Sequence, residues 1–205
     1  MVGRHRARLF KIVRSNGGKI ISNEVTTGIG RTGKWFGFNH YLIEPDIIAI
    51  GKGIGNGYPV SVTAINKNTI NELEMKPFIY SQSHQNDPLG CVVVNEVIKI
   101  IKEDDLVSKA ESKGKKFLSY LKSLQDNKTI TDVRGRGLMF AVDICGVEVA
   151  GILFEKLIEK GYIVCNRGTL FRIDPALTIN EELFNNFIND FRKILCEANT
   201  SSNSD

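Results

Sequence analysis

Lys52 is the residue of this sequence whose type and setting best suit covalent chemistry. It follows the apolar run 45–50, which predicts a short buried strand, and glycines occupy the positions on both sides of it. An amine that can lose its proton, held on a rigid element, can act as a nucleophile. The flanking glycines would let a ligand approach the backbone closely. Taken alone, however, a lysine between glycines is more often an exposed loop residue.

A second polar position ends another predicted strand, residues 19–25. The apolar pair Ile20 and Ile21 gives way there to Asn23 and Glu24. In open α/β sheets, ligands bind at the carboxyl edge of the strands. The sequence therefore predicts a ligand-binding edge at Asn23 and Glu24.

The glycine-rich loop 28–33 fits the G-x-G-x-x-G pattern that is typical of dinucleotide binding. Two features oppose this interpretation. The following segment, 34–41, is an aromatic cluster without a helical stripe, and Asp46 begins a strand where the dinucleotide fold needs an acidic residue at a strand's end. A dinucleotide-dependent oxidoreductase is therefore a distant alternative. Residues 46–53 are not a phosphate-binding P-loop either, because Asp46 and Gly53 stand where that motif needs Gly and Ser or Thr.

The order of predicted elements indicates two domains. An α/β piece extends to about residue 125, a small α+β domain follows over 126–199, and the polar residues 200–205 are expected to form a disordered tail. The elements of the first piece are a helix at 6–15, strands at 19–25, 45–50 and 60–65, and a mainly helical stretch at 88–124. Those of the second are an interrupted strand at 131–144, a helix at 147–160, strands at 162–166 and 170–174, and a helix at 181–196.

Composition limits the class of protein. The chain has 205 residues, of which 42% are hydrophobic and 24% charged, and its net charge is +4. These are ordinary globular values, and the basic and acidic residues are too nearly balanced to indicate a nucleic-acid partner. Basic residues crowd the first fourteen positions; a solvated helix face explains them better than a phosphate-binding arm.

The lack of recognisable targeting signals and the pattern of cysteines both favour a cytoplasmic location. The apolar runs are shorter than the roughly 18 residues of a membrane span, and the N-terminus lacks the apolar region of a secretory signal. The four cysteines, Cys91, Cys145, Cys165 and Cys196, match no common zinc pattern. We therefore expect free thiols in a reducing cytosol, with no metal and no membrane partner.

Three blocks within residues 23–63 carry the most specific signal. They read NEVTTGIGRTGKWF at 23–36, EPDI at 44–47 and GKGIGNGYP at 51–59. Together they closely resemble the signature of the class III, pyridoxal-phosphate-dependent aminotransferases, in the correct order and with the correct gaps. Weaker matches at 86–91, 133–139 and 170–179 extend the resemblance over nearly the whole chain, from Gly17 to Cys196.

The resemblance implies an α/β fold, the C-terminal part of a fold type I pyridoxal-phosphate transferase. It consists of part of the large domain's mixed sheet and a small α+β domain. The implied cofactor is pyridoxal 5'-phosphate, and Lys52 matches the lysine that forms the Schiff base with it and then acts as the base in the proton shift. Arg172 matches the arginine that grips the substrate carboxylate, a task that suits a bidentate guanidinium.

Further cofactor contacts follow from the same match. Asn23 stands where the family has the aspartate that pairs with the pyridine nitrogen, and an amide cannot stabilise a pyridinium by charge. Val25 matches the residue that packs on the ring face. Thr26 replaces a longer glutamine that contacts the ring hydroxyl. Ser83 matches a threonine whose hydroxyl reaches the cofactor phosphate of the neighbouring subunit.

The implied activity is transamination from an amino acid to a 2-oxo acid. The donor group is often a terminal amine, as in acetylornithine, ornithine, 4-aminobutyrate or diaminobutyrate. Chains of this family are considerably longer at the N-terminus, where most of the phosphate site lies. We therefore expect a chain that is inactive alone and works as a homodimer or with a partner chain supplying the missing N-terminal half. The alternative is a non-catalytic remnant or subunit of a split aminotransferase.

Overall fold

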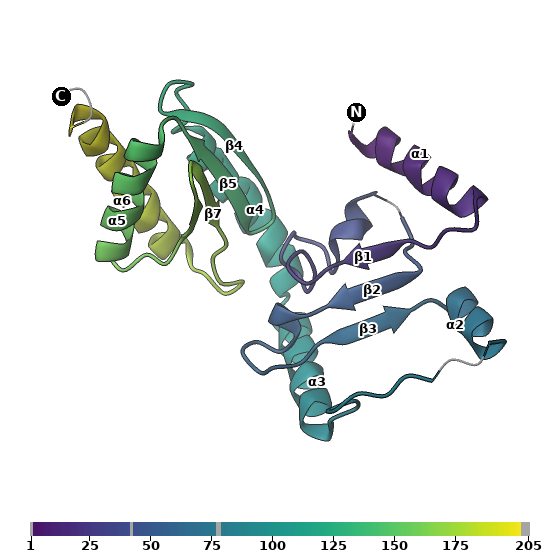
Figure 1. Ribbon diagram of the computed structural model, residues 1–205. Coiled ribbons are helices and arrows are strands. Elements are labelled where there is room, and N and C mark those ends of the chain that lie inside the picture. The colour runs from purple at the N-terminus through teal and green to yellow at the C-terminus, as the bar shows by residue number, and fades with distance from the viewer. Residues whose placement is uncertain (1, 42, 77–78, 202–205) are drawn as a thin grey trace. The chain divides into compact units, whose positions relative to one another are not determined.

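The chain folds into two compact units, Met1–Val107 and Ser108–Asp205. Figure 1 shows the computed structural model, which describes residues 2–41, 43–76 and 79–201. Within these ranges there is no helix long and apolar enough to cross a membrane.

The first unit is built on a three-stranded mixed sheet with strand order β1-β2-β3. Strand β1 (Ile21–Asn23) runs parallel to β2 (Ile47–Ile50), and β3 (Val62–Ile65) is antiparallel to β2. In the β1–β2 register Asn23 lies opposite Ala49. Because the two strands run in the same direction, the segments after Asn23 and after Ile50 leave the sheet at the same edge.

Helices precede and follow the strands of this sheet along the chain (Figure 1). Helix α1 (Val2–Ser15) precedes β1. Gly17 follows it with a φ of 75°, the left-handed conformation that closes many helices. Two 3-10 helices lie in the loops, η1 (Gly37–Tyr41) and η2 (Lys52–Ile54).

Helices α2 (Lys67–Glu74) and α3 (Pro88–Glu103) complete the first unit. Sequence patterning did not predict α2. It begins at Asn66, whose side chain caps it by accepting a hydrogen bond from Thr69 N at 2.9 Å. Helix α3 begins with Asp87 as its cap and proline at the next position, as helix starts commonly do.

The second unit packs three helices against one face of a four-stranded antiparallel sheet. The strand order is β4-β5-β7-β6. The strands are β4 (Ile130–Arg136), β5 (Met139–Ile144), β6 (Cys165–Arg167) and β7 (Leu170–Ile173), and the helices are α4 (Leu106–Lys122), α5 (Val147–Glu159) and α6 (Glu181–Ser201). The stretch expected as one interrupted strand is thus a hairpin, which turns at Gly137 with a φ of 55°.

The core of the second unit is rich in aromatic rings. Phe117 of α4 and Phe184 of α6 stack with their ring centroids 3.8 Å apart, and Phe171 and Phe191 meet edge to face. Alternate residues of β5 and β7 supply the sheet side of this core, for example Phe140 and Phe171, which are almost fully buried.

The division between the units lies nearer the N-terminus than the boundary expected at about residue 125. Helix α4 contributes Ala110, Phe117 and Leu121 to the core of the second unit, so the chain divides after Val107. At the other end, α6 continues to Ser201. Of the tail expected at 200–205, residues 202–205 lie outside the described part of the chain.

Candidate active site

Lys52 is the first residue of η2, separated from the end of β2 only by Gly51. Its φ of 48° is left-handed, an uncommon conformation for a residue with a side chain. Its exposed side chain turns towards the end of β1, where Nζ donates a hydrogen bond to Thr26 Oγ1 at 3.0 Å. The lysine amine is thus held by a hydroxyl at the carboxyl edge of the sheet.

Asn23, the last residue of β1, has a fixed amide orientation. Its Oδ1 accepts a hydrogen bond from Val25 N at 3.1 Å. Because only the oxygen of an amide can accept from a backbone N–H, the NH₂ group is the end that remains for a ligand. The exposed side chain of Asn23 therefore offers a hydrogen-bond donor.

Val25 connects these two positions. A Cβ added to Gly51 would lie 3.4 Å from a methyl group of Val25, so the residue before Lys52 passes directly beside this half-buried side chain. Four of the predicted site residues, Asn23, Val25, Thr26 and Lys52, therefore lie together where β1 and β2 end.

Between Asn23 and Val25 lies Glu24, which the sequence placed at the ligand-binding edge but which the structure buries. Glu24 is only 2% exposed, and it accepts hydrogen bonds from the loop that follows β1. The signal available in the sequence was a charged residue directly after an apolar strand. Its partners, up to fourteen positions away, could not be identified from spacing.

The glycine-rich loop does not continue into an α-helix, as the sequence predicted. Residues 24–36 form turns, and the 3-10 helix η1 follows. Ile29, Gly30 and Gly33 all have positive φ angles, between 57° and 83°. This conformation differs from the strand–turn–helix context that a dinucleotide motif requires.

Ser83 lies in the same unit but in a different set of contacts. It is exposed and lines a cavity of about 800 Å³ whose walls come from residues 58–63 and 82–95. At this cavity Tyr58 donates a hydrogen bond to Asp87 Oδ2 at 3.0 Å, and that bond raises the pKa of Tyr58. The structure thus places Ser83 beside the cap of α3, whereas the four residues above lie at the ends of β1 and β2.

Arg172 belongs to the second unit, where it lies on β7 opposite Ala141 and Cys165. Its guanidinium forms an ion pair with Asp174 through Nη2. Its Nε and the Oδ1 of Asp174 are buried without a hydrogen-bond partner. Arg172 is therefore partly neutralised by the carboxylate of Asp174, the residue that follows the end of β7.

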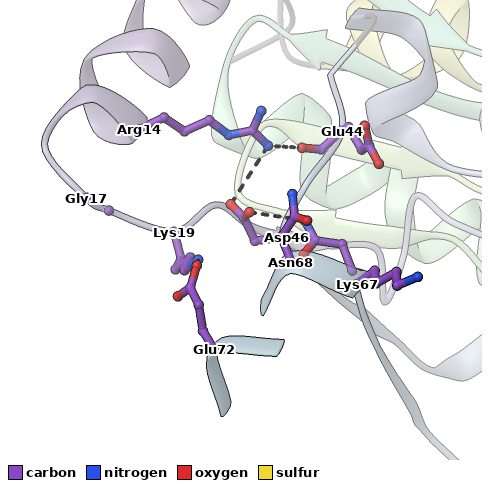
Figure 2. A pocket seen from close by; sticks show the side chains of 10 residues that line it. Arg14, Gly17, Lys19, Glu44, Asp46, Lys67, Asn68 and Glu72 are labelled. Carbon is purple, nitrogen blue, oxygen red and sulfur yellow. Dashed lines mark hydrogen bonds and ion pairs between the residues drawn. The ribbon is translucent and has the colours of Figure 1, made fainter. Parts of the chain in front are cut away.

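Figure 2 shows a cavity of about 620 Å³ in the first unit, lined in part by Arg14, Asp46 and Lys67. The carboxylate of Asp46 accepts hydrogen bonds from Ile20 N at 2.7 Å and from Asn66 Nδ2 at 3.1 Å. Burial alone would raise its pKa, but these bonds together with Arg14 hold the pKa below its ordinary value. Asp46 of the EPDI block therefore joins β1, β2 and the start of α2, which is a structural role.

Residues 5–195 match the family described as aminotransferase class-III. The chain belongs to the class III aminotransferases.

Known members of the family align in sequence with most of this chain. A LysW-aminoadipate semialdehyde/glutamate semialdehyde transaminase of Sulfolobus acidocaldarius is 36% identical over 170 residues, which are 82% of this chain and 43% of that protein. An acetylornithine aminotransferase of Caldanaerobacter subterraneus is 33% identical over 174 residues, 84% of this chain and 43% of that protein.

Solved transaminase structures superpose on most of this chain as well. An S-selective transaminase from Arthrobacter, determined with alanine bound, superposes with a TM-score of 0.90 at 25% identity, and the match covers 98% of this chain and 49% of that one. This class III chain has the fold type I arrangement over its length, and it spans between 43% and 49% of the length of these three proteins.

Membership of the class III aminotransferases implies pyridoxal 5'-phosphate as the cofactor. The residues at the ends of β1 and β2 fit the ring of that group. They offer an exposed amine at Lys52 for its carbonyl, an amide donor at Asn23 for its ring nitrogen, and the apolar side chain of Val25 for its ring face.

Proposed function

We propose that this chain supplies the ring-binding half of the pyridoxal-phosphate site in an aminotransferase. The reaction moves an amino group from an amino acid, with a terminal amine as the favoured donor group, to a 2-oxo acid. The observation that carries the proposal is the hydrogen bond of 3.0 Å that holds Lys52 Nζ on Thr26, beside the amide of Asn23. Since the chain covers less than half of its relatives, turnover belongs to an assembly that also contains the rest of the fold.

Pyridoxal phosphate, when bound, supplies a carbonyl that condenses with amines and a ring that draws electrons from the substrate. In this chain Lys52 would provide the amine for that carbonyl. Once the substrate's amine has displaced it, Nζ would be the base that removes the proton from the carbon bearing the transferred amino group. Thr26 orients the amine through its hydroxyl. A threonine hydroxyl cannot take the proton at neutral pH, so Lys52 Nζ itself would hold it and pass it to the carbon of the cofactor's carbonyl group.

Asn23 sets the electronic state of the ring nitrogen. Since its oxygen is committed to Val25 N, the side chain donates an N–H and so favours an unprotonated nitrogen. A neutral ring withdraws electrons less strongly than a pyridinium. In a competent assembly, Asn23→Asp should leave the transamination rate unchanged or raise it, because a carboxylate can hold the nitrogen protonated. A large loss would show that the site depends on the amide.

The proposal also assigns roles to two residues outside the ends of β1 and β2, Arg172 and Ser83. Arg172 binds the substrate carboxylate, in competition with Asp174. Ser83 binds the cofactor phosphate of a second subunit, which makes the working form a dimer or a complex with a chain supplying the missing half. The unpaired cysteines support a cytoplasmic location.

The second candidate is a non-catalytic subunit or remnant. Two observations favour it, the amide at Asn23 and the short side chain of Thr26, which is engaged with Lys52. Such a protein would keep the fold and the cofactor lysine without measurable turnover.

The test is to add pyridoxal phosphate to the full chain, record the absorbance, reduce with borohydride and map the modified lysine by mass spectrometry. We expect the label on Lys52. The variant Lys52→Ala should lose it, whereas Lys67→Ala, which removes an exposed lysine of the same unit, should keep it. A label spread over several surface lysines would contradict the proposal.

A further inference from the structure

The buried carboxylate of Glu24 receives a hydrogen bond from each of four donors. Oε1 accepts from Ser22 Oγ at 2.8 Å and from Phe38 N at 3.0 Å. Oε2 accepts from Thr27 Oγ1 at 2.6 Å and from Gly37 N at 2.7 Å. Each oxygen thus takes one hydroxyl and one backbone N–H, an arrangement that only an acceptor with two equivalent oxygens can satisfy.

These bonds close the loop that follows β1. Ser22 lies on β1 and Thr27 lies just after it, whereas Gly37 and Phe38 begin η1. Residues 24–38, which we call the closed loop, therefore leave Glu24 and return to it. The backbone of Glu24 is also fixed, because its N–H donates to Ala49 O of β2 at 2.8 Å.

The space around the carboxylate is filled by backbone. A Cβ at Gly28 would lie 2.7 Å from Glu24 O, and one at Gly37 would lie 3.1 Å from Glu24 Oε2 and 3.0 Å from Thr27 Cβ. Gly28 of the sequence block is thus required by its approach to Glu24, and Gly37, just after the block, is favoured by its own approach. Close approach, rather than phosphate binding, accounts for them.

The residues that would touch the cofactor are the chain neighbours of Glu24. Asn23 and Val25 stand on either side, Thr26 is next, and Thr26 holds Lys52. Loosening Glu24 would let the peptide 23–26 move relative to the end of β2, and Lys52 would lose its fixed partner.

We propose that Glu24 is a positioning residue for the cofactor site: its carboxylate locks the closed loop and so fixes Asn23, Val25 and Thr26 against Lys52. This inference rests on the proposed function only for the identity of the group that is positioned. The locking itself is a property of the chain and is measurable without a ligand.

Glu24→Gln is the most direct test, because it keeps the shape but replaces one accepting oxygen with an NH₂ group. The hydroxyl at that end can rotate and accept from the new group, but the backbone N–H of Gly37 or Phe38 cannot. We expect amide hydrogen exchange at one of these two residues to rise at least about tenfold, within the range for a buried donor left without an acceptor. Glu74→Gln, an exposed acid of the same unit, is the charge-matched control and should change nothing.

The second measurement is the pyridoxal phosphate concentration that half-labels Lys52 after borohydride reduction, taken below the melting transition of each variant. In Glu24→Gln we expect this concentration to rise about tenfold, with less preference for Lys52 over the exposed Lys67. Glu24→Asp keeps two oxygens but is one methylene shorter, so it should lie between Glu24→Gln and the wild type. If Glu24→Gln does not fold, Ser22→Ala and Thr27→Val, which each remove one hydroxyl donor, should show the same two changes more weakly.

The outcomes separate the two proposals. A wild-type chain that is not labelled at Lys52 contradicts the proposed function and leaves the exchange measurement to judge the locking. Unchanged exchange at Gly37 and Phe38 in Glu24→Gln overturns the locking. Faster exchange with unchanged labelling of Lys52 overturns the positioning role alone.

Discussion

The two compact units of this chain differ in how completely they bury their apolar residues. The largest fully buried side chains of the second unit are five phenylalanines, and they form one cluster with the apolar faces of α4, α5 and α6. The first unit buries mainly isoleucines and exposes more of its large apolar residues, among them Ile21 of β1 at 65% and Val92 of α3 at 64%. The second unit exposes fewer among its described residues, although Ile163 is 96% and Val147 71% exposed. A parallel strand pair normally lies inside a larger sheet that is covered on both faces. We therefore expect the second unit to fold on its own core and the first to need the rest of a larger sheet.

The position of the site follows the same division. Lys52, which we propose as the cofactor lysine, lies with its neighbours in the first unit, and Arg172 lies in the second. We expect stability to depend on the second unit and cofactor chemistry to depend on the first. The following predictions test that separation, beginning with the largest effect.

Fragments give the largest expected difference. Residues 108–205 should unfold cooperatively as a soluble fragment, because α4 completes the core. Residues 126–199, the span suggested by the sequence, lack Phe117 and Leu121 and should not. Residues 1–107 should aggregate, since exposed apolar residues and open sheet edges recruit other chains. Urea unfolding followed by circular dichroism and size-exclusion chromatography would decide; a soluble, cooperative 1–107 would break the comparison.

Point variants give the next effect. Phe117 is fully buried and stacks on Phe184, so Phe117→Ala should lower the free energy of unfolding by about 3–5 kcal/mol. Leu89 is 57% exposed in the first unit, and Leu89→Ala should change it by less than about 0.5 kcal/mol. The measurement is urea unfolding of the full chain. Equal effects at the two positions would show that the units do not differ in this way.

Thr26 tests the chemical side of the comparison. Thr26→Val removes the hydroxyl that accepts from Lys52 Nζ and keeps the side-chain shape. The pyridoxal phosphate concentration that half-labels Lys52 should rise roughly fivefold, the effect of one lost hydrogen bond of about 1 kcal/mol. Unfolding should hardly change, and Thr26→Ser should behave like the wild type. Equal labelling in Thr26→Val would remove Thr26 from the site.

The smallest effect concerns pH and the second unit. Asp126 Oδ1 accepts hydrogen bonds from Lys128 N, Thr129 N and Ile130 N. Burial opposes the change, but these bonds lower the pKa of Asp126 from 3.8 to about 2. The folded state therefore binds this proton less readily than the unfolded state, so the stabilisation is present above about pH 4 and is lost as the pH falls towards 2.

The expected result is a gap in melting temperature between the wild type and Asp126→Ala that is full at pH 7 and narrows between pH 4 and pH 2. Thermal melts at a series of pH values measure it. The exposed Asp104→Ala serves as the control for the loss of a charge. A gap of constant size over this range would contradict the assignment to Asp126.

Local patterns in the sequence predicted most helices and strands, but they missed one short helix and one tight turn. The apolar run before Lys52 and the periodic stripes at 147–160 and 181–196 predicted β2, α5 and α6, because burial of one face imposes a period. Helix α2 is only eight residues long and is marked mainly by its cap, so it was not predicted. The hairpin β4–β5 looked like one strand because its turn occupies only two residues.

The same distinction between local and distant contacts applies to the candidate site. Lys52, Asn23, Val25 and Thr26 could be chosen because they lie in two recognisable blocks, 23–36 and 51–59. The importance of Glu24 depends instead on donors at Gly37 and Phe38. The boundary near 125 missed the division at Val107 for a similar reason. The inner face of α4 serves the second unit, and a sequence pattern shows that a face is buried without showing what buries it.

The backbone at Lys52 carries a conflict between stability and chemistry. A left-handed φ of 48° costs a residue with a side chain roughly 1–2 kcal/mol, and glycine would avoid that cost. A design procedure that ranked residues at this position by folding energy alone would therefore replace the lysine with glycine. Stability-guided engineering of this protein must hold position 52 fixed, because the most favourable residue for the backbone there would remove the amine.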